Sequence, residues 1–220
     1  MVPVSPTLPP AVVFDCDGTI ADTESLSDRA WTETLARYGY TPTDDDFRAV
    51  IGYPFAQNWG HFSGRADLGD REAFRARLRE RFIALFEAEL WVYPDAVDTL
   101  RRLASEGVTI GVASSSSHDH VLRVLERGEV AHLVQAVVGA DDVERHKPDP
   151  APYLRAAELM QVPASACVAV EDTAVGVAAA KAAGMFTVAV LRGHHRREEL
   201  AAADRVVERI SPDAIRRPAG

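Results

Sequence analysis

The chain has 220 residues, of which 47% are hydrophobic and 26% charged, and its formal net charge is −9. These proportions are typical of a soluble globular protein with one large domain or one domain and a small insert, and no apolar run approaches the ~20 residues of a membrane span. The negative charge argues against a nucleic-acid or acidic-membrane surface, although it is compatible with a local positive pocket for a small anion.

The first residues and the two cysteines indicate a cytoplasmic protein. Residues 1–10 form a short proline-rich tail without the basic region and apolar core of a signal peptide. Cys16 and Cys167 lie in apolar, strand-like runs, so we expect buried thiols rather than a disulfide.

An apolar run over residues 11–14 leads into two carboxylates, Asp15 and Asp17, and then into Gly18. Such a short run is typical of a strand buried on both faces of a parallel sheet, and the glycine lets the chain leave the strand. The two carboxylates then lie at the C-terminal end of the strand, where open α/β sheets bind their ligands. On this stretch alone, a polar turn and a functional site are equally good interpretations.

Residues 23–92 have helical patterning. Apolar residues recur at helical spacing before Tyr38, and Thr43 with Asp46 resembles a capping box at the start of a short helix. Asp70 is expected to cap the longest helix.

The intervening residues 51–69 contain four glycines and one proline, so we expect them to be rich in loops. Because no part of residues 23–92 predicts a strand, we expect this segment to be a helical insert.

From Tyr93 onward, strands and helices alternate. Apolar runs predict strands at residues 108–113, 136–138, 167–170 and 186–190, with helical segments between them. This alternation predicts an α/β fold with a doubly wound parallel sheet and right-handed crossovers. The predicted core therefore consists of residues 1–22 and 93–220.

Polar residues follow three later elements of this core. Ser114 directly follows a strand and precedes a helix, an arrangement that suits an anion, although a helix-capping serine is the better interpretation of this residue alone. Lys147 offers a point charge to a phosphate, whereas a single lysine before a proline-rich loop is usually just exposed. Glu171 and Asp172 would repel each other without a nearby cation, and with Asp15 they offer the oxygen ligands that Mg²⁺ prefers.

Four motifs in this order resemble the haloacid dehalogenase superfamily. The segment 14–19 (Phe-Asp-Cys-Asp-Gly-Thr) is similar to the first motif, Ser114 to the second, the segment 147–150 (Lys-Pro-Asp-Pro) to the third, and Glu171-Asp172 to the fourth. The chain resembles the branch of β-phosphoglucomutase-like phosphatases, which carry a helical cap, here residues 23–92, on a Rossmann-like core. The combined signature is specific for the superfamily and uninformative about the substrate.

The resemblance implies an aspartyl-phosphate mechanism with Mg²⁺ as cofactor. Asp15 would attack phosphorus, and Asp17 would act as general acid and base. The Asp15 side chain, the Asp17 backbone carbonyl and Asp172 would hold Mg²⁺, while Glu171 would support these ligands from outside.

The resemblance further implies a small-molecule phosphorylated metabolite as substrate. Ser114, the N–H of Ser115 and Lys147 would bind the phosphoryl oxygens, and we expect neither a nucleic-acid nor a membrane partner. The expected activity is hydrolysis of a phosphate monoester; the oligomeric state stays open, with a monomer compatible with the sequence.

Particular residues bear on three other functions. A dehalogenase resembles this scaffold without the second aspartate, so Asp17 disfavours it. A phosphosugar mutase typically has a histidine on the first cap helix and an arginine in the cap loop, where this chain has Ser27 and Phe55. We therefore favour hydrolysis and predict Ser27 and Phe55 as specificity residues. A catalytically silent, phosphate-binding regulatory protein would lack an aspartate or Lys147, and all three residues are present.

His118 and His120 raise the question of a zinc site. We expect both in the first turn of a helix, where residues i and i+2 do not share a face, so we predict no site from this pair.

Overall fold

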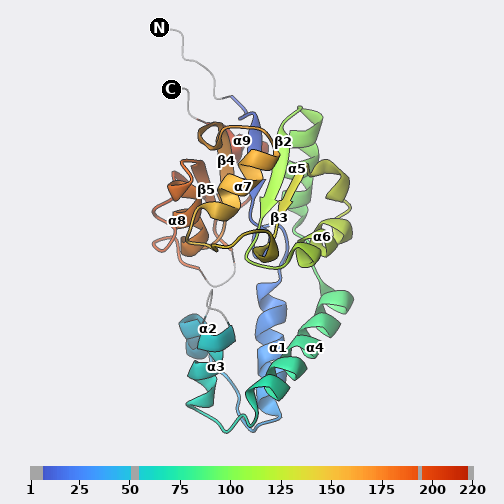
Figure 1. The fold of residues 1–220 in the computed structure, drawn as a ribbon, viewed down its shortest axis with the longest axis vertical. Coiled ribbons are helices and arrows are strands. Elements are labelled where there is room, and N and C mark those ends of the chain that lie inside the picture. Colours follow the sequence, from blue (N-terminus) through green and yellow to red (C-terminus); the bar gives the residue numbers. More distant parts are fainter. Residues whose placement is uncertain (1–6, 51–54, 193–194, 218–220) are drawn as a thin grey trace. The chain divides into compact units, whose positions relative to one another are not determined.

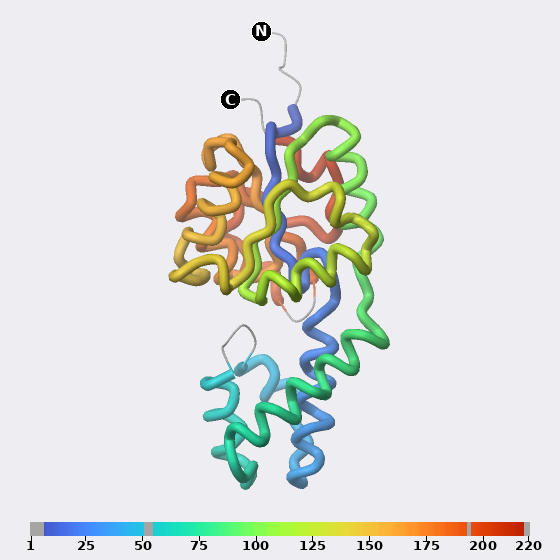
Figure 2. The backbone as a smooth tube through the Cα atoms, turned by 45° about the vertical axis from the view of Figure 1, so that its right-hand side comes forward, coloured from blue at the N-terminus to red at the C-terminus, as the bar shows by residue number. Residues whose placement is uncertain are grey.

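The computed structural model describes residues 7–50, 55–192 and 195–217. The chain divides into two compact units, shown in Figures 1 and 2: Met1–Asp22 with Val92–Gly220 form the sheet unit, and Thr23–Trp91 form the helical unit. Among the described residues, no helix is both long and apolar enough to cross a membrane.

The sheet unit contains a six-stranded parallel sheet with the order β3-β2-β1-β4-β5-β6. Its strands are β1 (Ala11–Phe14), β2 (Thr109–Ala113), β3 (Ala136–Val138), β4 (Cys167–Glu171), β5 (Phe186–Val190) and β6 (Arg205–Val207). The prediction of a doubly wound parallel sheet is confirmed. The edge strand β6 was not predicted, because three half-buried residues beginning with an arginine give no strand periodicity.

Helices cover both faces of this sheet (Figure 1). One face carries α7 (Ala151–Leu159) and α8 (Ala174–Ala182), while α5 (Pro94–Ser105) and α6 (His118–Arg127) form the crossovers that lead to β2 and β3. Right-handed crossovers put these two pairs on opposite faces, because the chain moves from β1 toward β3 and then returns past β1 to β4. The remaining helical segments are η1 (Ala131–Leu133), η2 (Ala140–Asp142), η3 (Ala164–Ala166) and α9 (Pro212–Ile215).

Alternation along the central strands fixes which residues face α7. Ala11 and Val13 of β1 pack in one cluster with Tyr153 of α7 and with Cys167 of β4. By the two-residue period of a strand, Asp15 continues the same row. Both cysteines are free and buried, as predicted.

The helical unit consists of α1 (Glu24–Ala36), α2 (Asp44–Val50), α3 (Phe55–Ser63) and α4 (Arg71–Glu89), with α1 packed along α4. The predicted caps are confirmed. The Asp70 carboxylate accepts the backbone N–H of Ala73 at 2.8 Å. Thr43 and Asp46 exchange the two hydrogen bonds of a capping box, with N···O distances of 2.9 and 3.3 Å.

The prediction that residues 51–69 are mainly loop was wrong for α3. Phe55, Trp59 and Phe62 recur at helical spacing and join one aromatic cluster with Trp31, so tertiary packing outweighs the low helix propensity of Gly60. Residues 51–54 lie outside the described residues.

Candidate functional site

The sheet order places the predicted residues at one switch point. β1 lies between β2 and β4, so the crevice at its carboxyl end is where the strand order reverses. Phe14 pairs with Val170, and the Asp15 N–H donates to the Val170 carbonyl at 2.8 Å. This parallel register brings Asp15 beside Glu171 at the ends of adjacent strands.

Asp15, Lys147 and Glu171 form a buried charged cluster. The Lys147 Nζ lies 2.6 Å from the Asp15 Oδ1 and 2.6 Å from the Glu171 Oε1. These three side chains are at most 8% exposed. Two carboxylates therefore share one buried ammonium group, and a buried charge is stable only when it is paired in this way.

The two carboxyl groups of this cluster have pKa values shifted in opposite directions. Burial, with smaller contributions from Glu171 and Asp17, raises the pKa of Asp15 to about 8 against the pull of Lys147. Burial would also raise the pKa of Glu171, but Lys147 and several hydrogen bonds hold it below its ordinary value. The pKa of Lys147 is raised, because the two carboxylates outweigh burial, which acts to lower it. Lys147 is therefore charged and balances Glu171 better than Asp15.

Five donors surround the Glu171 carboxylate. Its Oε1 accepts from Lys147 Nζ at 2.6 Å and from the Tyr153 hydroxyl at 2.8 Å. Its Oε2 accepts from the Asp172 N–H and from both the N–H and the hydroxyl of Thr173, at 3.0 to 3.1 Å. Gly176 permits this packing, since a Cβ there would lie 1.7 Å from the Glu171 Oε1.

The residues present fit a hard divalent cation. Carboxylate oxygens of Asp15, Glu171 and Asp172 lie within 4.8 Å of one another, and all three residues are buried. Oxygen donors in such a group suit Mg²⁺ or a similar cation. Gly18 has a φ of +79°, and a Cβ on it would lie 2.0 Å from the Asp172 Oδ2, so only glycine leaves this space clear.

Glu171 and Asp172 differ in how many hydrogen-bond donors surround their carboxylates, and therefore in how well each could bind a cation. Since five donors already occupy Glu171, the carboxylates best placed to hold a cation are Asp15 and Asp172. The Thr19 hydroxyl donates to the Asp172 Oδ1 at 3.2 Å and orients this carboxylate.

Asp17 lies between the ends of β1 and β2. The Ser114 hydroxyl donates to the Asp17 Oδ2 at 2.9 Å, and the Ser116 N–H donates to the Ser114 Oγ at 2.9 Å. The His120 Nε2 lies 2.8 Å from the Asp17 Oδ1. Ser115, between these groups, is exposed. The structure thus brings Asp15, Asp17, Ser114 and Lys147 to neighbouring strand ends.

Ser27 and Phe55, the predicted specificity residues, belong to the helical unit. Ser27 lies in the first turn of α1. The Phe55 ring stacks with Trp31 at a centroid distance of 6.0 Å, and the guanidinium groups of Arg71 and Arg75 lie 5.7 and 5.4 Å from its centroid. Phe55 therefore contributes to packing, and a role of either residue in specificity stays a prediction.

His120 and Tyr153 were not predicted as parts of this constellation, and Thr19 was predicted only as the last residue of the first motif. His118 and His120 do point apart, because the Nδ1 of His118 lies 2.7 Å from the Asp142 carboxylate rather than near Asp17. The available signal for His120 was its place in the first turn of the helix that follows Ser114. Tyr153 gave no signal, since its position on an apolar helix face reads as core.

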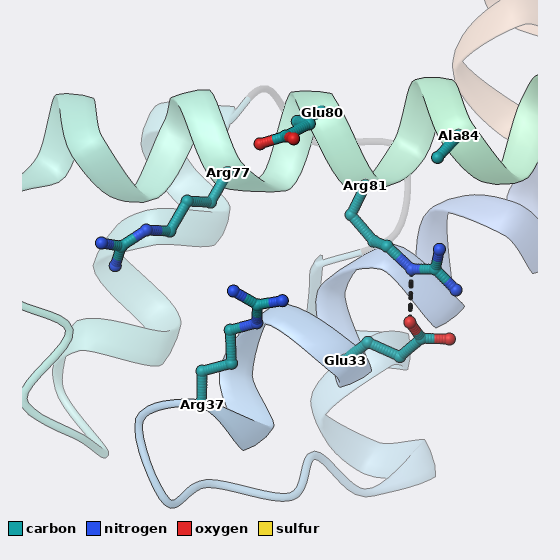
Figure 3. A pocket seen from close by; sticks show the side chains of 6 residues that line it. All are labelled: Glu33, Arg37, Arg77, Glu80, Arg81 and Ala84. Atoms are coloured by element: carbon teal, nitrogen blue, oxygen red, sulfur yellow. Dashed lines mark hydrogen bonds and ion pairs between the residues drawn. The ribbon is translucent and has the colours of Figure 1, made fainter.

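The helical unit has a pocket of its own, drawn in Figure 3. It has a volume of about 370 Å³ and lies between α1 and α4, lined by Glu33, Arg37, Arg77, Glu80, Arg81 and Ala84. Arg81 forms an ion pair with Glu33 across it, and both side chains are more than a third exposed. The hydrogen bond from Arg81 lowers the pKa of Glu33, which is the opposite direction to the shift of Asp15.

Comparison with known proteins relates this geometry to chemistry. A sequence model of the haloacid dehalogenase-like hydrolases matches residues 12–190. The chain is 34% identical over 199 residues to a phosphoglycolate phosphatase of Rhodospirillum rubrum, covering 86% of this chain and 82% of the relative. It is 32% identical over 185 residues, or 82% of its length, to Protein SUPPRESSOR OF QUENCHING 1, chloroplastic, of Arabidopsis thaliana, but spans only 18% of that longer protein.

A solved structure has the same fold. It is CbbY from Rhodobacter sphaeroides in complex with xylulose-(1,5)bisphosphate. The TM-score is 0.79 at 27% sequence identity, and the match covers 92% of this chain and 95% of that one.

Proposed function

Because the chain belongs to the haloacid dehalogenase-like hydrolases, we propose that it is a Mg²⁺-dependent phosphatase that hydrolyses a small phosphate monoester through an aspartyl-phosphate. One observation carries the proposal. The Asp15 carboxylate lies at the end of β1 against the buried Lys147 ammonium, with a second carboxylate, Asp17, two residues further on. We propose these side chains as the nucleophile (Asp15), the acid/base (Asp17) and the cationic phosphate ligand (Lys147), and their closeness at one strand end supports that assignment.

In the first step, a carboxylate oxygen of Asp15 attacks phosphorus, and the bond from phosphorus to the leaving oxygen breaks. Asp17 gives its proton to that oxygen, so the alcohol leaves neutral. Lys147, Ser114 and the N–H of Ser115 bind the phosphoryl oxygens as charge shifts among them.

In the second step, water attacks phosphorus and gives a proton to Asp17 while the bond to Asp15 breaks. Inorganic phosphate is released, and both aspartates return to their starting state. Mg²⁺ held by Asp15, Asp172 and the Asp17 backbone carbonyl would neutralise phosphoryl charge and favour the ionised form of Asp15. The raised pKa of Asp15 supports this ligand set, since an added positive charge offsets burial and the nearby acids.

Two relatives support a small phosphorylated metabolite as substrate. One is named for phosphoglycolate, and the solved CbbY structure binds a sugar bisphosphate. In this chain, Ser27 and Phe55 stand where a mutase of this branch has a histidine and an arginine, which favours transfer of the phosphoryl group to water. We propose that the helical unit acts as the cap that selects the organic portion.

The test is a panel of about a hundred phosphorylated metabolites, assayed for inorganic phosphate with Mg²⁺ or with a chelator. Acid-quenched protein should carry a phosphoryl group on the peptide that contains Asp15, and the Asp15→Asn variant should not. Metal-independent turnover or labelling of another residue would contradict the mechanism. An isomeric phosphate formed without release of inorganic phosphate would show a mutase instead.

A further inference from the structure

Ser114 and His120 contact the Asp17 carboxylate, one on each oxygen. The Ser114 hydroxyl donates to Oδ2 at 2.9 Å, and the His120 Nε2 lies 2.8 Å from Oδ1. An ionised carboxylate only accepts hydrogen bonds, so the imidazole donates through Nε2–H. The side chains of His120 and Asp17 are 16% and 27% exposed, which partly shields their contact from water.

The fold explains why a histidine reaches Asp17 from a different element. His120 is the third residue of α6, and Ser117 caps this helix by accepting the His120 N–H. Helical side chains lean toward the N-terminus of their helix, which here points back to the loop after β2. Because β2 pairs with β1, this direction leads to the turn that carries Asp17.

In the proposed reaction, substrate binding would break the hydrogen bond from Ser114 to Asp17 but not the one from His120. Ser114 is also a predicted phosphate ligand. When its hydroxyl donates to a phosphoryl oxygen, it can no longer donate to the Asp17 Oδ2. His120 is not among the predicted phosphate ligands. Asp17 would otherwise lose a positioning partner as the substrate arrives.

We infer that His120 is the positioning residue that holds Asp17 during turnover, an inference that rests on the proposed phosphatase function. With Oδ1 occupied by the imidazole donor, the proton of the acid form resides on Oδ2, the oxygen that Ser114 releases. That oxygen gives the proton to the leaving group and later takes one from water. The role requires only Nε2–H, which both the imidazolium ion and the Nε2–H tautomer carry.

The experiment compares His120→Ala, His120→Gln and His120→Asn on two substrates. One is an alkyl phosphate, whose leaving group needs an acid, and the other is an aryl phosphate whose leaving group does not. The ratio kcat/KM reports the steps up to departure of the leaving group. General acid catalysis contributes about 10²–10⁴-fold, so His120→Ala should lower kcat/KM for the alkyl phosphate by about 10-fold or more and leave that for the aryl phosphate nearly unchanged.

The amide variants test the donor itself. The longer Gln side chain places its amide nitrogen near the position of the imidazole Nε2, so His120→Gln should recover most of the activity, whereas the shorter His120→Asn should not. His118→Gln is the matched control, because His118 lies on the same helix but contacts Asp142. This control should keep the parental kcat/KM on both substrates.

A double-mutant cycle with Asp17→Asn completes the test. If His120 acts through Asp17, adding His120→Ala to Asp17→Asn should cause no further loss. Additive losses, or equal losses on both substrates, would overturn the inference while an active parent keeps the proposed function. A parent that releases no phosphate from any substrate would overturn the proposed function, and the inference with it.

Discussion

Two buried aspartates, one in each unit, have opposite environments. Asp46 of the helical unit accepts from the Thr43 N–H and hydroxyl, the Tyr40 hydroxyl and the His61 ring, and it pairs with Arg65, all at 2.8 to 3.0 Å. Although burial opposes the effect, the donors of Thr43, His61 and Tyr40 hold the pKa of Asp46 well below its ordinary value. This carboxylate is ionised, and hydrogen-bond donors contact both of its oxygens.

Burial raises the pKa of Asp15 to about 8, because the Lys147 ammonium that opposes this rise is shared with Glu171, and Glu171 and Asp17 add to it. The comparison separates two uses of a buried carboxylate. A buried carboxylate with many hydrogen-bond donors, such as Asp46, stabilises the fold. A buried carboxylate among other acids, such as Asp15, is unfavourable until a cation or a substrate binds, and such perturbed groups are typical of functional sites. The predictions below test this distinction.

The largest expected effect is on kcat, which should fall when Asp15 is replaced but not when Asp46 is replaced. Asp15→Asn should lower kcat by about 10³-fold or more, because an amide does not attack phosphorus, and losses of this order follow removal of a nucleophile. Asp46→Asn should leave kcat of the folded protein unchanged. Steady-state kinetics on protein shown to be folded by circular dichroism checks both variants. A comparable loss of kcat in Asp46→Asn would remove the distinction.

The second prediction concerns the cation. Mg²⁺ should raise the melting temperature of the parent, since a ligand that binds only the folded state at 100 times its Kd adds about 2.7 kcal/mol. Asp172→Asn should require more Mg²⁺ for the same shift, because it loses one of the two best-placed carboxylates. Thermal denaturation over a Mg²⁺ titration, with a chelated control, measures this without turnover. Identical half-saturation in the two proteins would exclude Asp172 as a ligand.

The third prediction concerns acid stability. A carboxyl with a lowered folded-state pKa stabilises the fold above its ordinary pKa, near 4, and this stability is lost as the pH falls through the folded value. Asp46→Asn should therefore lower the free energy of unfolding at pH 7 by about 1–3 kcal/mol and flatten its decline below pH 5. Asp44→Asn is the control, because its side chain on the same helix is 95% exposed. Urea unfolding at several pH values between 7 and 3 gives the free energy of unfolding as a function of pH. If this free energy declines with acid as steeply in Asp46→Asn as in the parent, Asp46 does not stabilise the fold in this way.

The smallest expected effect comes from removing one donor from each cluster. Tyr153→Phe deletes the hydroxyl that contacts Glu171, and Tyr40→Phe deletes the one that contacts Asp46. Each should lower the free energy of unfolding by about 1 kcal/mol. Only Tyr153→Phe should also change KM, since Glu171 orients Lys147. Equal KM values in both variants and the parent would show that the Tyr153 hydroxyl has a purely structural role.

Sequence reasoning predicted the fold where the pattern was local and strong. The mainly apolar runs that become β1, β2, β3, β4 and β5 are short, and their order predicted the parallel sheet. The strand β6 and the helix α3 were missed for opposite reasons. β6 begins with an arginine and lacks the wholly apolar run of the equally short β3, and the glycines and proline of residues 51–69 suggested a loop where packing around Trp31 in fact supports a helix.

The site was predictable to the extent that strand ends are predictable. Asp15, Asp17, Ser114 and Lys147 were selected because parallel strands bring their carboxyl ends to one edge, and the structure places these side chains there. His120 and Tyr153 could not be selected in this way. Their roles depend on the direction of one side chain from a helix, and the three-dimensional packing sets that direction.

The point where the helical unit joins the sheet unit has a consequence for how such enzymes diversify. The chain leaves after Asp22 and returns at Val92, yet Ala21 and Val92 form an antiparallel bridge, and the Tyr93 N–H donates to the Ile20 carbonyl at 2.9 Å. Exit and re-entry are therefore already paired within the sheet unit. The entropy of closing an inserted segment grows only with the logarithm of its length, so segments of very different size can be accommodated at this junction. Under the proposed role of the helical unit as a substrate-selecting cap, exchanging the insert while leaving the strand ends untouched would change the substrate at little risk to the fold.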